Sequence, residues 1–175
     1  TVRGDGNCFY RAVLFSLIER MIEQGDSKKA SEITATVEQS LKNLVSLGYP
    51  EYTLEDFHES VLEFFKWVQT SLVGQHTTQP QDRSVLVEEM KSRFTDDDMS
   101  QCLICYVRFM ISCLLQQNKD EYEPFVYATN YLSIEEYCRN EVEVMGKECD
   151  NLSMFATAKL FDLCLYIEYL DVSLD

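Results

Sequence analysis

Apolar residues recur at helical spacing along most of the chain. In the first such pattern Leu14, Leu17 and Met21 share one face, while polar residues fill the opposite face. A repeat of about 3.6 residues predicts an amphipathic helix, which we expect to begin near Cys8. Gly25 follows the last residue of this pattern, in the position where glycine commonly ends a helix.

The same periodicity predicts further helices. Residues 99–117 are apolar on nearly every side, so we expect them to form the central helix of the core. A Thr53 cap is expected to start the third helix, with Phe57 on its buried face. The predicted helices after the first cover about residues 28–47, 53–72, 84–94, 99–117, a short stretch before Asn130, 133–142 (opening on a Ser-x-x-Glu capping box) and 151–161.

One segment near the end of the chain has the character of a strand. Residues 164–170 (CLYIEYL) are rich in aromatic and β-branched side chains, which is typical of a strand. A lone strand is not stable, so its partners must come from elsewhere, and we expect them to lie beyond the end of the chain. The predicted class is therefore α+β: a mostly helical domain with a small β-sheet.

Charge narrows the possible partners. The chain has 15 Lys and Arg against 30 Asp and Glu, a formal net charge of −15. Nucleic acids and anionic membrane surfaces are bound by clustered basic residues, so this composition argues against both. No stretch reaches the roughly 20 uncharged apolar residues of a membrane span. A protein partner with a basic face suits the charge better.

The cysteines predict a reducing compartment and no metal. Seven is an odd number for a disulfide framework, and no secretory signal pattern precedes them. Four of them, including the Cys102-x-x-Cys105 pair, lie in apolar runs, where cysteine usually packs as a small buried residue. A zinc site needs a second ligand pair at suitable spacing, so we interpret the pair as core packing and expect no cofactor. The four are Cys102, Cys105, Cys113 and Cys164.

The strongest local motif is Gly4-Asp5-Gly6-Asn7-Cys8, directly before the first helix. A glycine-rich loop can turn sharply and aim several amides at one point, and the helix dipole favours a thiolate at Cys8. A thiolate beside ready amide donors is the arrangement that acyl transfer requires. A tight turn capped by Asp5 or Asn7, with a structural cysteine, explains the same residues.

A cysteine hydrolase also needs a base, which is usually histidine. The chain has two histidines: His58, expected on the solvated face of the third helix, and His76, in a polar loop. Neither has neighbours in the sequence that mark it as catalytic.

Beyond this motif, the chain resembles the otubains, a subfamily of the ovarian-tumour (OTU) cysteine deubiquitinases. The resemblance is collinear and spans nearly the whole chain. The matching segments are residues 2–12 (VRGDGNCFYRA), 55–58 (EDFH), 122–125 (YEPF), 141–150 (EVEVMGKECD) and 168–171 (EYLD). Three segments depart from the family pattern. Val144 stands where proline is usual, residues 151–154 (NLSM) replace a histidine-containing run, and residues 94–101 lack the usual N-D-x-S-x-S-like pattern.

The resemblance implies a papain-like isopeptidase that cuts between the C-terminal glycine of ubiquitin and a lysine. Cys8 would be the nucleophile, Asp5 the active-site acid, and the amides of Asp5, Gly6 and Cys8 the oxyanion hole. The family's histidine base has no counterpart here and is expected in sequence beyond Asp175. Residues 1–175 would then be a single OTU domain truncated at both ends.

The implied partners are ubiquitin and polyubiquitin chains, with ubiquitin-conjugating enzymes as further candidates, in the cytoplasm or nucleus. A second hypothesis remains open: a catalytically inactive protein that lacks the base and regulates by binding ubiquitin or a conjugating enzyme.

Overall fold

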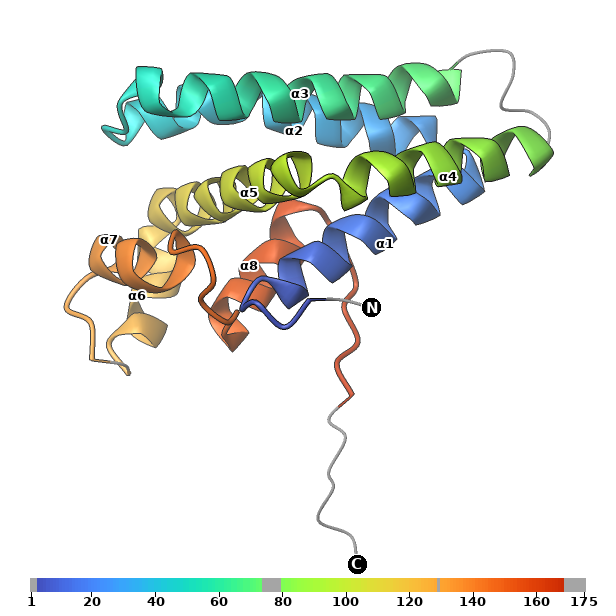
Figure 1. Ribbon diagram of the computed structural model, residues 1–175. Helices are drawn as coiled ribbons and strands as arrows, with labels where there is room; N and C mark the ends of the chain where they lie inside the picture. The colour runs from blue at the N-terminus through green and yellow to red at the C-terminus, as the bar shows by residue number, and fades with distance from the viewer. Residues whose placement is uncertain (1–2, 74–79, 129, 169–175) are drawn as a thin grey trace, which may run out of the picture.

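The computed structural model describes residues 3–73, 80–128 and 130–168, and every described element is a helix. The helices run in sequence order from blue to red in Figure 1. Their bounds are α1 (Cys8–Gln24), α2 (Ser27–Ser46), α3 (Glu51–Val73), α4 (Pro80–Thr95), α5 (Asp97–Gln117), α6 (Lys119–Val126), α7 (Ile134–Tyr137), the π-helical turn η2 (Cys138–Val142) and α8 (Asn151–Leu160).

Helix α5 lies at the centre of the molecule and contacts every other described helix. Helices α2 and α3 form an antiparallel hairpin on one side of it, and α6, α7 and α8 lie on the other side (Figure 1). Helices α1 and α4 pack against each other along the remaining flank. The predicted role of residues 99–117 as the core helix is therefore confirmed.

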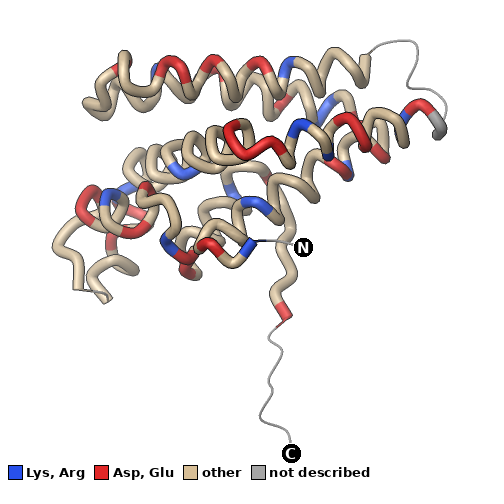
Figure 2. The backbone as a smooth tube through the Cα atoms, in the orientation of Figure 1, with Lys and Arg blue, Asp and Glu red and all other residues tan. Residues whose placement is uncertain are grey.

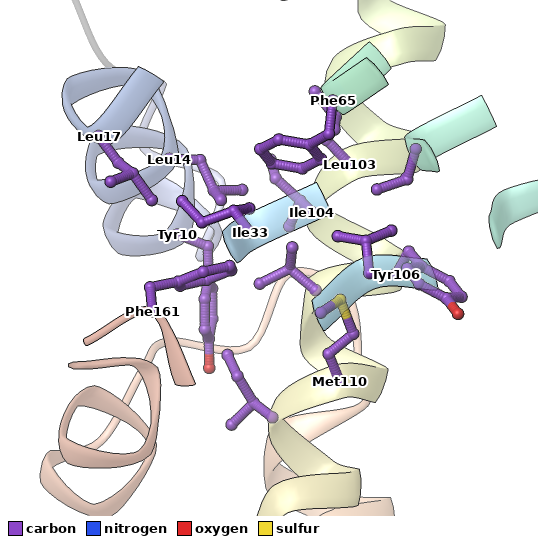
Figure 3. Packing of buried hydrophobic residues seen from close by; sticks show 14 of the residues in the cluster. Tyr10, Leu14, Leu17, Ile33, Phe65, Leu103, Ile104, Tyr106, Met110 and Phe161 are labelled. Atoms are coloured by element: carbon purple, nitrogen blue, oxygen red, sulfur yellow. The ribbon is translucent and has the colours of Figure 1, made fainter. Parts of the chain in front are cut away.

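Side chains from α1, α2, α3 and the segment after α8 meet those of α5 in one continuous core (Figure 3). Because all these faces are apolar, their burial supplies the main driving force for folding. The labelled members of the core are Tyr10, Leu14, Leu17, Ile33, Phe65, Leu103, Ile104, Tyr106, Met110 and Phe161.

Truncating a side chain at this centre should be costly. Ile104 is fully buried, so Ile104→Ala removes apolar contacts and leaves a cavity. We expect the free energy of unfolding to fall by about 2–5 kcal/mol in a urea titration. Val85→Ala, at a position 70% exposed on α4, is the matched control and should change it by less than about 0.5 kcal/mol. Equal losses from the two variants would contradict the central placement of α5.

The helix ends follow the capping residues of the sequence. Gly25 ends α1 in the left-handed conformation, with φ +66°, and the Asp26 side chain then accepts a hydrogen bond from the Lys29 amide. Ser133 caps α7 as predicted. Three starts differ by two residues or more: α3 begins at Glu51 rather than at a Thr53 cap, α4 begins at 80 rather than 84, and α5 begins at Asp97 rather than 99.

The predicted strand is not seen in the described residues. Residues 163–168 have no regular secondary structure, and Tyr166 is 90% exposed. A strand needs a neighbour to accept and donate its backbone hydrogen bonds, and residues 3–73, 80–128 and 130–168 offer none. Cys164 is consequently exposed, which corrects its predicted burial. Residues 169 and 170 of the predicted strand lie outside the described residues.

Length and mean hydropathy would allow one described helix, α5, to span a membrane. In the fold, 61% of its most apolar window is buried inside the protein, as in a core helix. Acidic residues are spread over most of the helices rather than gathered on one of them (Figure 2).

Candidate active site

The loop before α1 is held against a second loop through two glycines. Gly6 has φ +73°, and a Cβ placed on it would lie 1.8 Å from the backbone oxygen of Gly146. Gly146 itself has φ +80°. The two backbones therefore approach so closely that only glycine fits at position 6. The glycine requirement that the motif predicted is confirmed at Gly6, where it comes from a partner 140 positions away in the chain, but not at Gly4, whose φ is not in the left-handed region.

Asp5 organises this loop from within. Its Oδ1 accepts hydrogen bonds from the Asn7 amide at 3.0 Å and from Arg11 Nη1 at 3.0 Å, while Oδ2 accepts from Arg11 Nη2 at 2.8 Å. This two-pronged pair with Arg11, one turn into α1, holds the pKa of the Asp5 carboxyl well below its ordinary value. Asp5 is thus a fixed anion that shapes the turn.

The depressed pKa of Asp5 predicts a pH-dependent contribution to stability. A carboxyl with a folded pKa below its unfolded value, near 3.8, stabilises the fold above that value and loses the effect as pH falls through the folded pKa. We expect the melting temperature of wild type to exceed that of Asp5→Asn at pH 6, with a difference that shrinks below about pH 4. A difference that is constant from pH 6 to pH 2 would contradict the pairing, and Arg11→Gln should behave like Asp5→Asn.

Asn7 points into the protein and does not cap α1. It is 3% exposed, and its Oδ1 accepts hydrogen bonds from Arg108 Nη2 at 2.7 Å and from the Gly146 amide at 3.0 Å. The interpretation of Asn7 as a simple helix cap is therefore wrong, because its side chain ties the loop to α5 and to the Gly146 loop. Asp5 supplies the turn hydrogen bond instead.

Cys8 is the first residue of α1, and it is exposed. The helix dipole favours negative charge at this end. Within the described part of the chain, the amides of Gly6 and Cys8 have no hydrogen-bond acceptor, whereas the Asp5 amide lies against its own carboxylate. An accessible sulfur thus lies beside unpaired amide donors, which are the parts that an acyl-transfer site requires.

The described residues bring no histidine to Cys8. His58 Nε2 lies 3.1 Å from the Val37 oxygen on α2, and its ring packs against Tyr106, so it is half-buried rather than solvated as predicted. Tyr106 and Arg108 are two positions apart on α5 and point to nearly opposite faces. The Cys8 loop meets the Arg108 face. Helix α3, which carries His58, lies on the other side of α5 from the start of α1 (Figure 1).

Two further predictions concern the burial of Phe57 on α3 and the role of His76 in the loop after it. Phe57, predicted to be buried, is 39% exposed, because the buried face of α3 is rotated toward Leu54 and Val61. His76 lies outside the described residues.

The remaining cysteines pack as structural side chains, with one exception. Burial raises the pKa of the Cys102 and Cys105 thiols, and Cys102 Sγ lies 3.8 Å from the Phe57 carbonyl oxygen. Among the residues that the structure describes, no group of three His, Cys, Asp or Glu could hold a metal ion. Cys164 is the exception, because its side chain is exposed.

Sequence reasoning missed two residues of the site, Arg11 and Arg108. Arg11 belongs to the motif and pairs with Asp5, but nothing in the spacing indicated that pair. Arg108 is fully buried at the centre of the site's supporting helix. The available signal was a lone basic residue within the apolar run of α5, since such a charge is retained only where something pairs with it.

Comparison with known proteins agrees with this geometry. The family model described as Peptidase C65 Otubain matches residues 1–175. The chain is 32% identical over 169 residues to human ubiquitin thioesterase OTUB1, covering 97% of this chain and 56% of that protein. It is 31% identical over 171 residues to the Arabidopsis thaliana OVARIAN TUMOR DOMAIN-containing deubiquitinating enzyme 1, covering 98% of this chain and 53% of that protein. The chain thus spans about half the length of these curated relatives.

Solved structures agree as well. The fold superposes with a TM-score of 0.77 and 30% identity on a structure titled h/ceOTUB1-ubiquitin aldehyde-UBC13~Ub, covering 93% of this chain and 57% of that one. A ceOTUB1 ubiquitin aldehyde UBC13~Ub complex gives a TM-score of 0.76 at 30% identity, covering 93% and 59%. The predicted resemblance is confirmed: the chain belongs to the peptidase C65 otubain family.

Proposed function

We propose that this protein is a deubiquitinating cysteine protease that hydrolyses the isopeptide bond between ubiquitin and lysine. The observation that carries the proposal is an exposed Cys8 that lies beside the unpaired amides of Gly6 and Cys8 at the start of α1. Membership of the otubain family supports it, as do relatives named ubiquitin thioesterases.

In the proposed reaction, Cys8 Sγ attacks the carbonyl carbon of the C-terminal glycine of ubiquitin. The carbonyl oxygen becomes an oxyanion, which the loop amides stabilise. Removing one such donor typically lowers the rate by about 100- to 1000-fold. The carbon–nitrogen bond then breaks, and lysine leaves as an amine after taking a proton from the base. Water hydrolyses the thioester and releases Cys8. The base is a histidine from outside the described residues.

The proposed partners follow the same reasoning. The titles of the solved neighbours name ubiquitin aldehyde and UBC13~Ub, which supports ubiquitin, polyubiquitin chains and conjugating enzymes as partners here. The net charge of −15 suits a basic protein partner. Seven free thiols suit a reducing location in the cytoplasm or nucleus.

A second candidate function is regulation by binding alone. The observation that favours it is that the described residues bring no histidine to Cys8. A protein without the base could hold ubiquitin or a charged conjugating enzyme without cleaving either.

One experiment separates the two functions. The full-length protein is incubated with ubiquitin carrying a C-terminal vinyl methyl ester, and the mass of the product is measured. A covalent adduct at Cys8, together with cleavage of di-ubiquitin, supports the protease. Ubiquitin binding by calorimetry with neither adduct nor cleavage supports the regulatory protein and sinks the protease.

A further inference from the structure

Arg108 is a fully buried cation at the middle of α5. Its Nη2 lies 2.7 Å from Asn7 Oδ1, 3.3 Å from the Gly6 oxygen and 2.6 Å from the Lys147 oxygen, and its Nη1 donates to the Val142 oxygen at 2.9 Å. One guanidinium therefore reaches both the Cys8 loop and the loop that follows η2.

The surroundings of Arg108 make the burial of its charge costly in free energy. All four acceptors are neutral oxygens, and no carboxylate pairs with it in the described residues. Its Nε has no acceptor, and its guanidinium carbon lies 4.3 Å from the centre of the Tyr10 ring. Burial lowers the pKa of Arg108, which reflects the cost of removing this charge from water. An apolar side chain would fill the same volume without a desolvated charge, but it would leave the Val142, Lys147 and Gly6 oxygens without this donor. The arginine is therefore explained by what it holds and not by packing alone.

The contacts of Arg108 fix the backbone beside Cys8. The Gly6 carbonyl turns toward Arg108 instead of accepting a bond from the first turn of α1. Turning that carbonyl inward sets the plane of the peptide between Gly6 and Asn7. The Asn7 side chain, itself held by Arg108, also accepts from the Gly146 amide. The peptide between Gly6 and Asn7 carries the Asn7 amide, which donates to Asp5. It lies between the peptides that carry the Gly6 and Cys8 amides. The direction of those two amides thus depends on both loops being tied to Arg108.

We propose that Arg108 is a positioning residue for catalysis at Cys8: its guanidinium ties residues 6–7 to residues 142–147 and thereby presets the amides that receive the oxyanion. This inference rests on the proposed protease function. The planar fork of arginine can satisfy several carbonyls at fixed angles, whereas the ammonium of lysine is a single point of charge. Arg108→Lys therefore keeps the charge and most of the volume while losing the tie between the loops.

The test uses the full-length protein and two readouts. Hydrogen–deuterium exchange reports the loops directly, and we expect the amides of residues 143–149 to exchange at least about tenfold faster in Arg108→Lys, with α2 and α3 unchanged. Steady-state cleavage of a ubiquitin C-terminal amide substrate reports catalysis. A displacement of about 1 Å in a reacting geometry costs on the order of 100-fold in rate, so kcat should fall by about that factor while KM is unchanged.

Two further variants keep the outcome clear. Arg93→Lys is the matched control, because Arg93 lies on α4, pairs with Glu89 and should give wild-type values in both readouts. Asn7→Ala removes one acceptor of Arg108 without changing α5, and it should also lower kcat. This variant decides the test if Arg108→Lys does not fold.

Each result has one meaning. Faster loop exchange with a lower kcat supports the inference. The inference is overturned if Arg108→Lys leaves loop exchange unchanged, or if it speeds loop exchange but leaves kcat unchanged. If Arg108→Lys does not fold, a wild-type kcat in Asn7→Ala overturns the inference. If wild type neither cleaves the substrate nor reacts with the ubiquitin ester, the proposed function fails, and with it the catalytic role of Arg108, whereas the exchange measurement still reports the structural tie.

Discussion

Replacing Cys8 with alanine should abolish cleavage of di-ubiquitin by the full-length protein, with a loss of at least about 10,000-fold in rate. The reason is that the proposed reaction has no other nucleophile at the start of α1, and the loop amides alone give only residual catalysis. Because the Cys8 side chain is exposed, its removal leaves no cavity. The melting temperature should therefore equal that of wild type within error.

The matched control for this change is Cys164→Ala. Cys164 is also an exposed free thiol, but it follows α8 and lies outside the Cys8 loop. It should retain the wild-type rate of di-ubiquitin cleavage, measured by gel densitometry over time. Cleavage by Cys8→Ala at the wild-type rate would refute Cys8 as the nucleophile, and equal losses in both variants would point to a general effect of removing thiols.

Gly6→Ala is expected to have the second largest effect, on both stability and activity. The left-handed backbone at position 6 costs an alanine about 1–2 kcal/mol. The added Cβ would also lie 1.8 Å from the Gly146 oxygen, so the two loops must separate. We expect the free energy of unfolding to fall by more than the backbone cost alone, measured by urea denaturation. Adduct formation with the ubiquitin ester should slow by about 100-fold, because the amides move with the loop.

Gly4→Ala provides the control for the same loop. Nothing lies within 4 Å of a Cβ built on Gly4, and its φ is not in the left-handed region. This variant should keep the wild-type unfolding free energy to within about 0.5 kcal/mol. If Gly4→Ala and Gly6→Ala were equally active and equally stable, the close approach of Gly6 and Gly146 would have no functional consequence.

The helices could be predicted because their causes are local. The spacing of Leu14, Leu17 and Met21, and capping residues such as Asp26, act within one or two turns of the chain. The central place of α5 was also predictable, since a helix that is apolar on nearly every side is typical of the core of a folded domain. The nucleophile motif was readable for the same reason, because Gly6 and Cys8 are neighbours in the sequence.

The strand and the face of α3 could not be predicted reliably. Residues 164–168 have the composition of a strand, yet a strand forms only with a partner, and composition does not supply one. Phe57 is exposed and His58 is half-buried, the reverse of what was expected, because the rotation of α3 about its axis depends on where α2 and α5 pack. Periodicity identifies an apolar face but not which of its marginal residues are covered.

By itself, the sequence therefore determined the helical plan, the acidic surface and the Gly-Asp-Gly-Asn-Cys loop at the start of α1. Only the tertiary structure decided how that loop is held: Gly6 against Gly146, Asn7 on the Gly146 amide, and Arg108 on both loops. The physical reason is distance along the chain. Hydrogen bonds between residues about 100 to 140 positions apart leave no periodic pattern, and they exist only once packing around α5 brings those segments together.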